Sequence, residues 1–231
     1  MKKIIVANWK CNPETRKEAE GLFNEIKSGV KKNKKVETII AAPFVWLPFL
    51  KGLTLAAQDC HWEEKGAYTG QISPKMLKSM GVEYVIIGHS ERRKYFQETD
   101  EIINKKLKAA LKLGLIPILC IGEKEGEDAK TVVDKQLQED LNGISDKDLN
   151  NIIVAYEPIW AISTSGGEIC SPETAKMVLG LIRLKFNGKI IYGGSVDSKI
   201  ISGYLSVGYE GALVGGASLK GEEFVKTVGN A

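Results

Sequence analysis

Eight short apolar runs, rich in β-branched residues, recur along the chain and alternate with longer amphipathic stretches. Most of these runs are continuously apolar, which is typical of parallel strands covered on both faces. We therefore expect strands at residues 4–7, 38–41, 53–57, 84–87, 116–120, 152–155, 189–192 and 211–214. Segments that offer a capping residue or an N1 proline for a helix lie between the runs: Pro13-Glu14-Thr15, Ser73-Pro74, Thr99-Asp100-Glu101 and Ser171-Pro172-Glu173.

Eight strand-then-helix units in 231 residues predict an α/β fold of the (β/α)8 barrel type, at the compact end of its usual length. No Pro/Ser-rich linker and no shift in composition divides the sequence. We therefore expect a single barrel domain over residues 1–231. An open doubly wound sheet is the alternative, but its G-x-G-x-x-G motif does not follow the first expected strand.

The charge pattern argues against a nucleic-acid partner. The formal net charge is +3, and a lysine cluster falls between two expected elements: Lys31, Lys32, Lys34 and Lys35. A nucleic-acid surface needs basic residues gathered on one face with aromatic residues among them. A solvated loop is the better interpretation of this cluster.

The cysteines and the N-terminal segment indicate the cellular setting. The cysteines are widely and unevenly spaced, which argues against a zinc site or a disulfide framework: Cys11, Cys60, Cys120 and Cys170. Only a short apolar run follows the N-terminus, so we expect no signal peptide and no membrane contact. A cytoplasmic protein without a bound metal is the expectation.

The segment Gly88-His89-Ser90-Glu91-Arg92-Arg93 directly follows the apolar run at 84–87. A histidine at this place lies beside the unpaired N–H groups of a starting helix, whose partial positive charge disfavours an imidazolium. A neutral imidazole can donate a hydrogen bond to a substrate carbonyl and move protons near neutral pH. Taken alone, however, His89 could simply cap the helix or pack.

Chemically useful residues follow five of the expected strands. In a barrel of this type the active site lies at the carboxyl ends of the strands. Each residue has an ordinary structural interpretation, such as a surface carboxylate or a glycine turn, but their coincidence on five strand ends favours one site. The site would hold a carboxylate base, a cation, a neutral donor and phosphate-binding glycine turns: Asn8, Lys10, His89, Glu91, Glu157, Gly193-Gly194-Ser195 and Gly215-Gly216.

Over essentially its whole length the chain resembles the triosephosphate isomerase family. The resemblance rests on segments in a fixed order: Asn8-Trp9-Lys10, Ala56-Ala57-Gln58, Gly66-Ala67-Tyr68-Thr69-Gly70, Gly88 to Arg93, Cys120-Ile121-Gly122-Glu123, Ala155 to Ile162, Tyr192 to Val196 and Val214 to Leu219. It implies interconversion of dihydroxyacetone phosphate and D-glyceraldehyde 3-phosphate through an enediolate, in glycolysis and gluconeogenesis.

The resemblance also implies a role for each site residue. Glu157 would be the base and His89 the electrophile and proton donor, an assignment for which this family is a standard worked example. Lys10 would stabilise negative charge, Asn8 would polarise the carbonyl oxygen, and Glu91 would pair with Lys10. Backbone N–H groups would hold the phosphate at Ser163, Ser195, Gly215 and Gly216. No cofactor is expected, because the substrate carbonyl is its own electron sink.

The resemblance further implies a homodimer through the loop of residues 58–71, which begins with Gln58 and ends with Gln71. This loop contains Trp62 and Tyr68, apolar groups that are unfavourable in water. The family usually has Glu at the position of Gln71, so an intersubunit pair to Arg92 is in doubt and Glu98 becomes the expected partner of Arg92.

Two other departures from the family pattern affect the loops around the site. Residues 163–168 read Ser-Thr-Ser-Gly-Gly-Glu, where the family usually continues Gly-Thr-Gly-Lys. Gly166 and Gly167 could provide a relocated hinge. Asp59 stands where the family commonly has Asn.

Two rival functions remain open at this point. One is an isomerase or lyase of a larger sugar or indole phosphate, since phosphate sites recur on this fold. The short chain, which leaves little loop for a larger pocket, argues against it. The other is a barrel without activity that serves as a binding module, against which the intact set of site residues argues.

Overall fold

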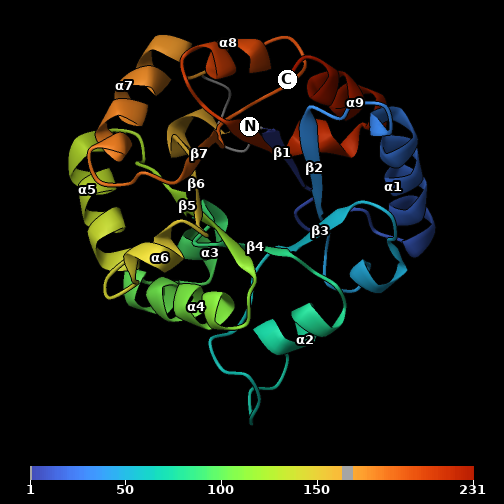
Figure 1. Ribbon diagram of the computed structural model, residues 1–231, viewed down its shortest axis with the longest axis horizontal. Coiled ribbons are helices and arrows are strands. Elements are labelled where there is room, and N and C mark those ends of the chain that lie inside the picture. The colour runs from blue at the N-terminus through green and yellow to red at the C-terminus, as the bar shows by residue number, and fades with distance from the viewer. Residues whose placement is uncertain (1, 163–168) are drawn as a thin grey trace.

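The computed structural model describes residues 2–162 and 169–231 and contains a closed barrel of eight parallel strands, ordered β1 to β8, with β8 paired back to β1. Figure 1 looks along the barrel, with the helices in a ring around the strands. The predicted (β/α)8 fold is confirmed. The strands are β1 (Lys3–Asn8), β2 (Val36–Ala41), β3 (Thr54–Ala57), β4 (Tyr84–Ile87), β5 (Ile116–Ile121), β6 (Ile153–Tyr156), β7 (Lys189–Tyr192) and β8 (Gly211–Val214).

All eight expected strands are present, with ends that differ by at most two residues from the expectation. The helices are α1 (Arg16–Val30), α2 (Pro74–Ser79), α3 (Ser90–Tyr95), α4 (Asp100–Lys112), α5 (Ala129–Asp140), α6 (Asp146–Leu149), α7 (Pro172–Arg183), α8 (Ile201–Ser206) and α9 (Gly221–Gly229). Single 3-10 turns form η1 (Leu47–Phe49), η2 (Ile159–Ala161) and η3 (Gly216–Leu219).

The expected helix starts are confirmed by side-chain caps. Thr15 forms a capping box with Glu18 at the start of α1, which satisfies two N–H groups that would otherwise lack partners. Ser73, Thr99 and Ser171 each accept a hydrogen bond from a backbone N–H in the first turn of their helix. The lysines at 31–35 lie in an exposed turn after α1, as expected.

The core has two layers, as continuous apolar strands require. One set of strand side chains fills the barrel interior, among them Val6, Ile39 and Ile86. The other set packs outward against the helices, whose buried side chains include Phe23 of α1 and Leu107 of α4. Because both faces of the strands are occupied, most polar residues of the sheet lie at strand ends, and Glu37 and Thr38 inside β2 are exceptions. In a barrel of this type the chemistry lies at the carboxyl ends of the strands.

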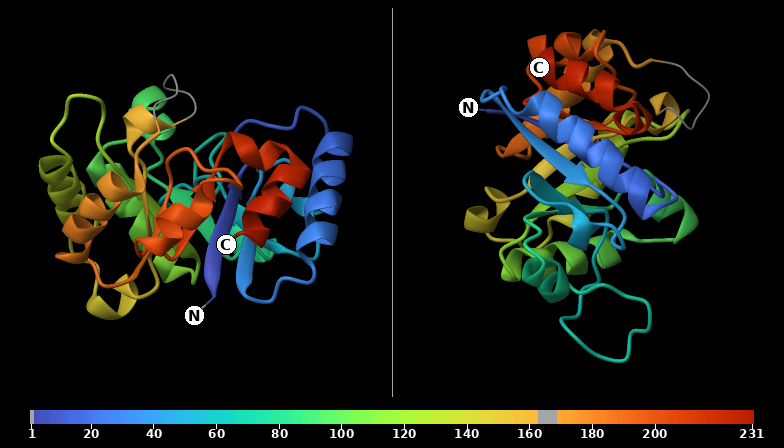
Figure 2. Two further views of the ribbon diagram at one scale, coloured as in Figure 1. Left: turned by 90° about the horizontal axis from the view of Figure 1, so that it is seen from above. Right: turned by 90° about the vertical axis from the view of Figure 1, so that its right-hand side faces the viewer.

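The loop between β3 and α2 departs from the compact barrel. It projects beyond the ring of helices, at the bottom of Figure 1 and of the right-hand view in Figure 2. His61 lies at its base, only 5% exposed, with its ring centroid 4.2 Å from that of Trp62 and 4.5 Å from that of Tyr68. The aromatic rings therefore pack together within the segment that the sequence predicted as a dimer loop.

A buried charge cluster joins three helices on one side of the barrel. Arg93 of α3 forms ion pairs with Asp100 of α4 and with Asp140, the last residue of α5. Asp140 is fully buried. Burial raises the pKa of the Asp140 carboxyl from its ordinary value of 3.8 to about 7, against the opposing effect of the Arg93 charge.

The raised pKa of Asp140 predicts a pH-dependent stability. The folded chain holds the Asp140 proton more tightly than the unfolded chain, so this contribution is full below pH 4 and is lost as the pH rises to about 7. Asp140→Asn stays neutral and avoids this loss. Its free energy of unfolding in urea, relative to the wild type, should be higher at pH 8 than at pH 5, by up to about 3 kcal/mol at roughly 1.4 kcal/mol per pKa unit.

The exposed residue Asp146 at the start of α6 offers a matched control. Asp146→Asn should shift the free energy of unfolding by the same amount at both pH values. An Asp140→Asn effect that is equal at pH 5 and pH 8 would contradict the prediction.

Candidate active site

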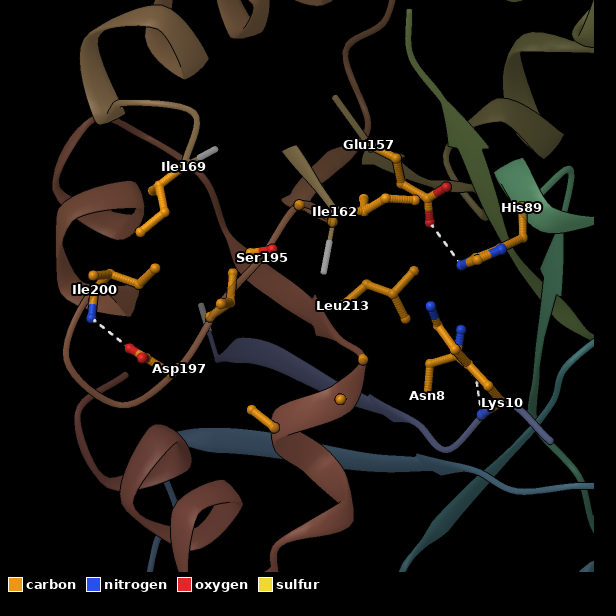
Figure 3. A pocket seen from close by; sticks show the side chains of 16 residues that line it. Asn8, Lys10, His89, Glu157, Ile162, Ile169, Ser195, Asp197, Ile200 and Leu213 are labelled. Carbon is orange, nitrogen blue, oxygen red and sulfur yellow. Dashed lines mark hydrogen bonds and ion pairs between the residues drawn. The ribbon is translucent and has the colours of Figure 1, made fainter. Parts of the chain in front are cut away.

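A pocket of about 200 Å³ opens at the carboxyl ends of the strands. Most of the expected site residues line it: Asn8, Lys10, His89, Glu157 and Ser195, which Figure 3 labels, and Gly215 and Gly216. Glu91 lies beside it in contact with Lys10. Ser163 and the proposed hinge glycines Gly166 and Gly167 lie outside the described residues. The structure thus brings together residues from β1, β4, β6, β7 and β8, far apart in the sequence.

Glu157 follows the last residue of β6 and is 2% exposed. Its backbone N–H donates to Ile121 O at 2.7 Å, which fixes the start of its side chain. Its Oε2 accepts a hydrogen bond from Ser90 N at 3.2 Å, at the first turn of α3. Its Oε1 accepts no hydrogen bond of normal geometry from the described residues, although His89 Nε2 lies 3.3 Å from it. A buried carboxylate with one oxygen that faces the pocket is suited to proton transfer.

Two glycines leave the space that Glu157 occupies. A Cβ at Gly122 would lie 1.9 Å from Glu157 O, and a Cβ at Gly193 would lie 2.8 Å from Glu157 Cγ. Any larger residue at 122 would displace the Glu157 backbone, whereas one at 193 would push its side chain. These contacts give a physical reason for glycine at both positions, of which sequence reasoning had treated only Gly193 as part of a turn.

His89 is the N-cap residue of α3, so its capping role is also present. Its Nδ1 accepts a hydrogen bond from Glu91 N at 3.2 Å. An accepting Nδ1 carries no proton, so the imidazole proton belongs on Nε2 in this arrangement. That Nε2 lies 3.3 Å from Glu157 Oε1 (Figure 3). The imidazole therefore points its donor nitrogen into the pocket beside the carboxylate.

Lys10 supplies the positive charge of the pocket. Its Nζ forms the expected ion pair with Glu91 Oε1, at 2.7 Å. Its backbone is left-handed, with φ of +52°, a conformation that costs energy for a residue other than glycine. Two amides hold it: Asn8 Oδ1 accepts from Lys10 N at 3.0 Å, and Gln58 Nε2 donates to Lys10 O at 2.8 Å.

The residues expected to hold phosphate differ in their present contacts. Gly215 and Gly216 line the pocket at the end of β8, where η3 begins. Ser195 also lines it, but both its N–H and its hydroxyl donate to Ala161 O, at 3.1 and 2.8 Å. A phosphate on the Ser195 amide would therefore have to replace the Ala161 carbonyl.

Sequence reasoning missed the apolar side of the pocket and the support behind it. Ile162, Ile169, Ile200 and Leu213 line the cavity. The sequence does not distinguish these residues as pocket-lining, because apolar residues normally belong to the hydrophobic core.

Glu123 is likewise buried, and its Oε1 accepts hydrogen bonds from Tyr156 OH at 3.0 Å and Trp160 Nε1 at 2.7 Å. It thus anchors η2, the turn that follows Glu157. No local sequence pattern predicts the hydrogen bond between Trp160 and Glu123, because the two residues lie 37 positions apart.

Other features bear on cofactors, metals and membranes. Within residues 2–162 and 169–231, no three His, Cys, Asp or Glu side chains are grouped so that they could hold a metal ion. In the same part of the chain, no helix has the length and apolar character needed to cross a membrane.

Comparison with known proteins gives a consistent result. A family model described as triosephosphate isomerase matches residues 3–231. A protein named triosephosphate isomerase from Alkaliphilus oremlandii is 46% identical to this chain, over 97% of both chains. One from Caldanaerobacter subterraneus subsp. tengcongensis is 47% identical, over 97% of this chain and 98% of its own length. One from Citrifermentans bemidjiense is 44% identical over 98% of both chains. The barrel, the pocket and these matches agree: the chain belongs to the triosephosphate isomerase family.

Proposed function

We propose that this chain interconverts dihydroxyacetone phosphate and D-glyceraldehyde 3-phosphate at the pocket described above, with Glu157 as the base. The observation that carries this proposal is the 3.3 Å approach of Glu157 Oε1 to His89 Nε2 inside a pocket that also holds Lys10. A base, a neutral donor and a cation around one small space are what proton transfer next to a carbonyl requires. We place the activity in glycolysis and gluconeogenesis.

The chemistry balances without an external reagent. Glu157 takes a proton from the carbon next to the substrate carbonyl, and the electron pair moves onto the carbonyl oxygen to give an enediolate. His89 donates its Nε2 proton to that oxygen and accepts one from the neighbouring hydroxyl. Glu157 then returns its proton to the other carbon. Substrate and product are isomers, so no cofactor is consumed.

The remaining residues stabilise charge in this scheme. The Lys10 ammonium lies where negative charge develops on the enediolate and the phosphate. Asn8 Oδ1 is already engaged by Lys10 N, which leaves the Asn8 amide N–H groups for the carbonyl oxygen. We assign phosphate binding to the backbone N–H groups of Ser195, Gly215 and Gly216, with Ser195 exchanging the Ala161 carbonyl for phosphate. Glu91 supports Lys10 by ion pairing.

We also propose a homodimer that forms through the projecting loop of residues 58–71. Exposed apolar side chains lie in and beside this loop: Tyr68 within it, Met76 in α2 directly after it, and Phe44 in a cleft shared with Gly70 and Gln71. An apolar surface of this kind favours association. Arg92 does not need a carboxylate from a partner subunit to balance its charge, because Glu98 and Asp59 of its own chain lie 2.6 and 2.9 Å from it.

We also propose a cytoplasmic location, which cell fractionation can check.

Shortening the base tests the proposed function. Glu157→Asp moves the carboxylate away from the reacting carbon by about one methylene, so kcat should fall about a hundred-fold or more while KM changes little. A coupled assay with D-glyceraldehyde 3-phosphate measures both. Glu210→Asp, at the opposite end of the barrel where Glu210 pairs with Arg183, is the control and should keep normal kinetics. A normal rate in Glu157→Asp would remove Glu157 from its role, and a wild type without turnover would refute the function.

Charging the apolar surface tests the homodimer. The double variant Tyr68→Lys, Met76→Lys places two cations where apolar contact is proposed, so the dimer dissociation constant should rise at least ten-fold, which corresponds to about 1.4 kcal/mol. Analytical ultracentrifugation measures it. Met177→Lys, on the exposed face of α7, is the matched control and should not change the mass in solution. A wild type that sediments as a monomer with full activity would contradict the proposal.

A further inference from the structure

Arg93 lies on α3 and is not among the residues that line the pocket. Its Nε donates to Gly88 O at 2.9 Å and its Nη2 to Asp140 Oδ2 at 2.7 Å. Its Nη1 donates to Asp100, and Nη2 also reaches Cys120 O at 3.4 Å. One guanidinium therefore connects β4, β5, α4 and α5. The planar fork of arginine donors suits such a junction better than an ammonium does.

These contacts are centred on His89. The side chain of Arg93 holds the carbonyl of Gly88, and the backbone N–H of Arg93 donates to the carbonyl of His89 at 3.1 Å. The His89 carbonyl also accepts from the backbone N–H of Arg92, at 2.8 Å, so the helix backbone holds that peptide and the Arg93 side chain holds the Gly88 peptide. Since backbone direction determines where a side chain points, fixing both peptides fixes the direction of the imidazole.

Gly88 makes this arrangement possible. Its φ of +75° lies in the left-handed region that glycine tolerates. A Cβ there would lie 3.2 Å from both Arg93 Nη2 and Cys120 O. The turn from β4 into α3 is therefore closely packed against the guanidinium, and a movement of Arg93 is transmitted to the Gly88 peptide.

Asp140 holds the guanidinium in place from behind. It ends α5, is fully buried, and gives one oxygen to Arg93 while its Oδ1 has no hydrogen-bond partner among the described residues. A buried carboxyl with an unpaired oxygen costs free energy, and its ion pair orders the Arg93 guanidinium. Its loss would leave Arg93 Nη2 with only the 3.4 Å contact to Cys120 O.

We propose that Arg93 and Asp140 are positioning residues, which hold the Gly88 peptide that precedes His89 and so aim the His89 Nε2 into the pocket. Neither side chain lines the pocket, so both act through the backbone of the β4–α3 turn. The proposal rests on the proposed function only in that it treats His89 as the proton donor. The link from Asp140 to the imidazole can be measured without any turnover.

Asp140→Ala removes the acceptor, whereas Asp140→Asn keeps an oxygen at the same place. We expect kcat of Asp140→Ala to fall about ten-fold, since a displacement of 1 Å can cost about a hundred-fold and this shift is smaller. KM should stay within about two-fold, because the proposed phosphate-binding residues are untouched. Asp140→Asn should restore most of the lost kcat. If Asp140 only supported the fold, Asp140→Ala would lower the free energy of unfolding but would not lower kcat while leaving KM unchanged.

The chain has only two histidines, His61 and His89, so a protein labelled with ¹⁵N-histidine gives an uncrowded spectrum. The imidazole nitrogen signals of His89 should move in Asp140→Ala and return toward their wild-type positions in Asp140→Asn, while those of His61 stay unchanged. Glu210→Ala is the control, because it breaks the Arg183 pair at the opposite end of the barrel and should leave the His89 signals in place.

Arg93→Lys provides a second test if Asp140→Ala does not fold. A lysine keeps the charge but has no planar fork that could hold Gly88 O and Asp140 together, so the His89 signals should move and kcat should fall as in Asp140→Ala. A folded Asp140→Ala or Arg93→Lys protein with wild-type His89 signals and kcat would overturn the proposal. A wild type that lacks isomerase activity would instead refute the proposed function, and the histidine spectra would still test the positioning role.

Discussion

Pairing of β8 with β1 closes the sheet, and the arrangement of the site depends on that closure. In the register Ala7 lies opposite Val214, so the residues that follow the first and the last strand become neighbours. This brings Lys10 to Gly215, where an added Cβ would be 3.5 Å from Lys10 Cε. With every strand parallel, all eight carboxyl ends open on one face. The proximity of residues separated by most of the chain is thus a result of hydrogen bonding in the sheet.

Within that face, the short helix α3 organises the electrostatics. Its first turn donates Ser90 N–H to Glu157 and Glu91 N–H to the imidazole of His89. Backbone N–H groups at a helix start carry partial positive charge, so one turn of main chain helps to hold a buried carboxylate and also orients the imidazole beside it. The backbone of α3 therefore contacts both His89 and Glu157 and links their positions.

Sequence reasoning was most successful where the determining signal was local. Apolar runs and capping residues lie within a few positions of the structure they specify, so the strands and the caps at Thr15, Ser73, Thr99 and Ser171 were predicted correctly. The pairing of Lys10 with Glu91 and of Arg92 with Glu98 came from family resemblance and is confirmed. The pocket residues were brought together as expected, although their individual roles stay proposals.

The ion pairs among the helices around the barrel could not be predicted from local sequence patterns. Arg93 meets Asp140, and Lys106 meets Asp59, across 47 positions in each case, and no local pattern distinguishes such carboxylates from those in solvent. Burial decides their properties: it raises the pKa of Asp59 despite the nearby Lys106 and Arg92 charges. The expected Arg92–Glu98 pair is connected to this cluster, because Lys106 pairs with both Asp59 and Glu98.

The left-handed backbone of Lys10 has a consequence for how such a chain evolves. A lysine there is maintained against its own conformational preference by the amides of Asn8 and Gln58, so a glycine would relieve strain while removing the cation. Selection for thermal resistance alone would drive this position away from lysine. Its presence therefore records selection for chemistry, and laboratory screens that reward only heat tolerance would be expected to enrich inactive barrels altered at this residue.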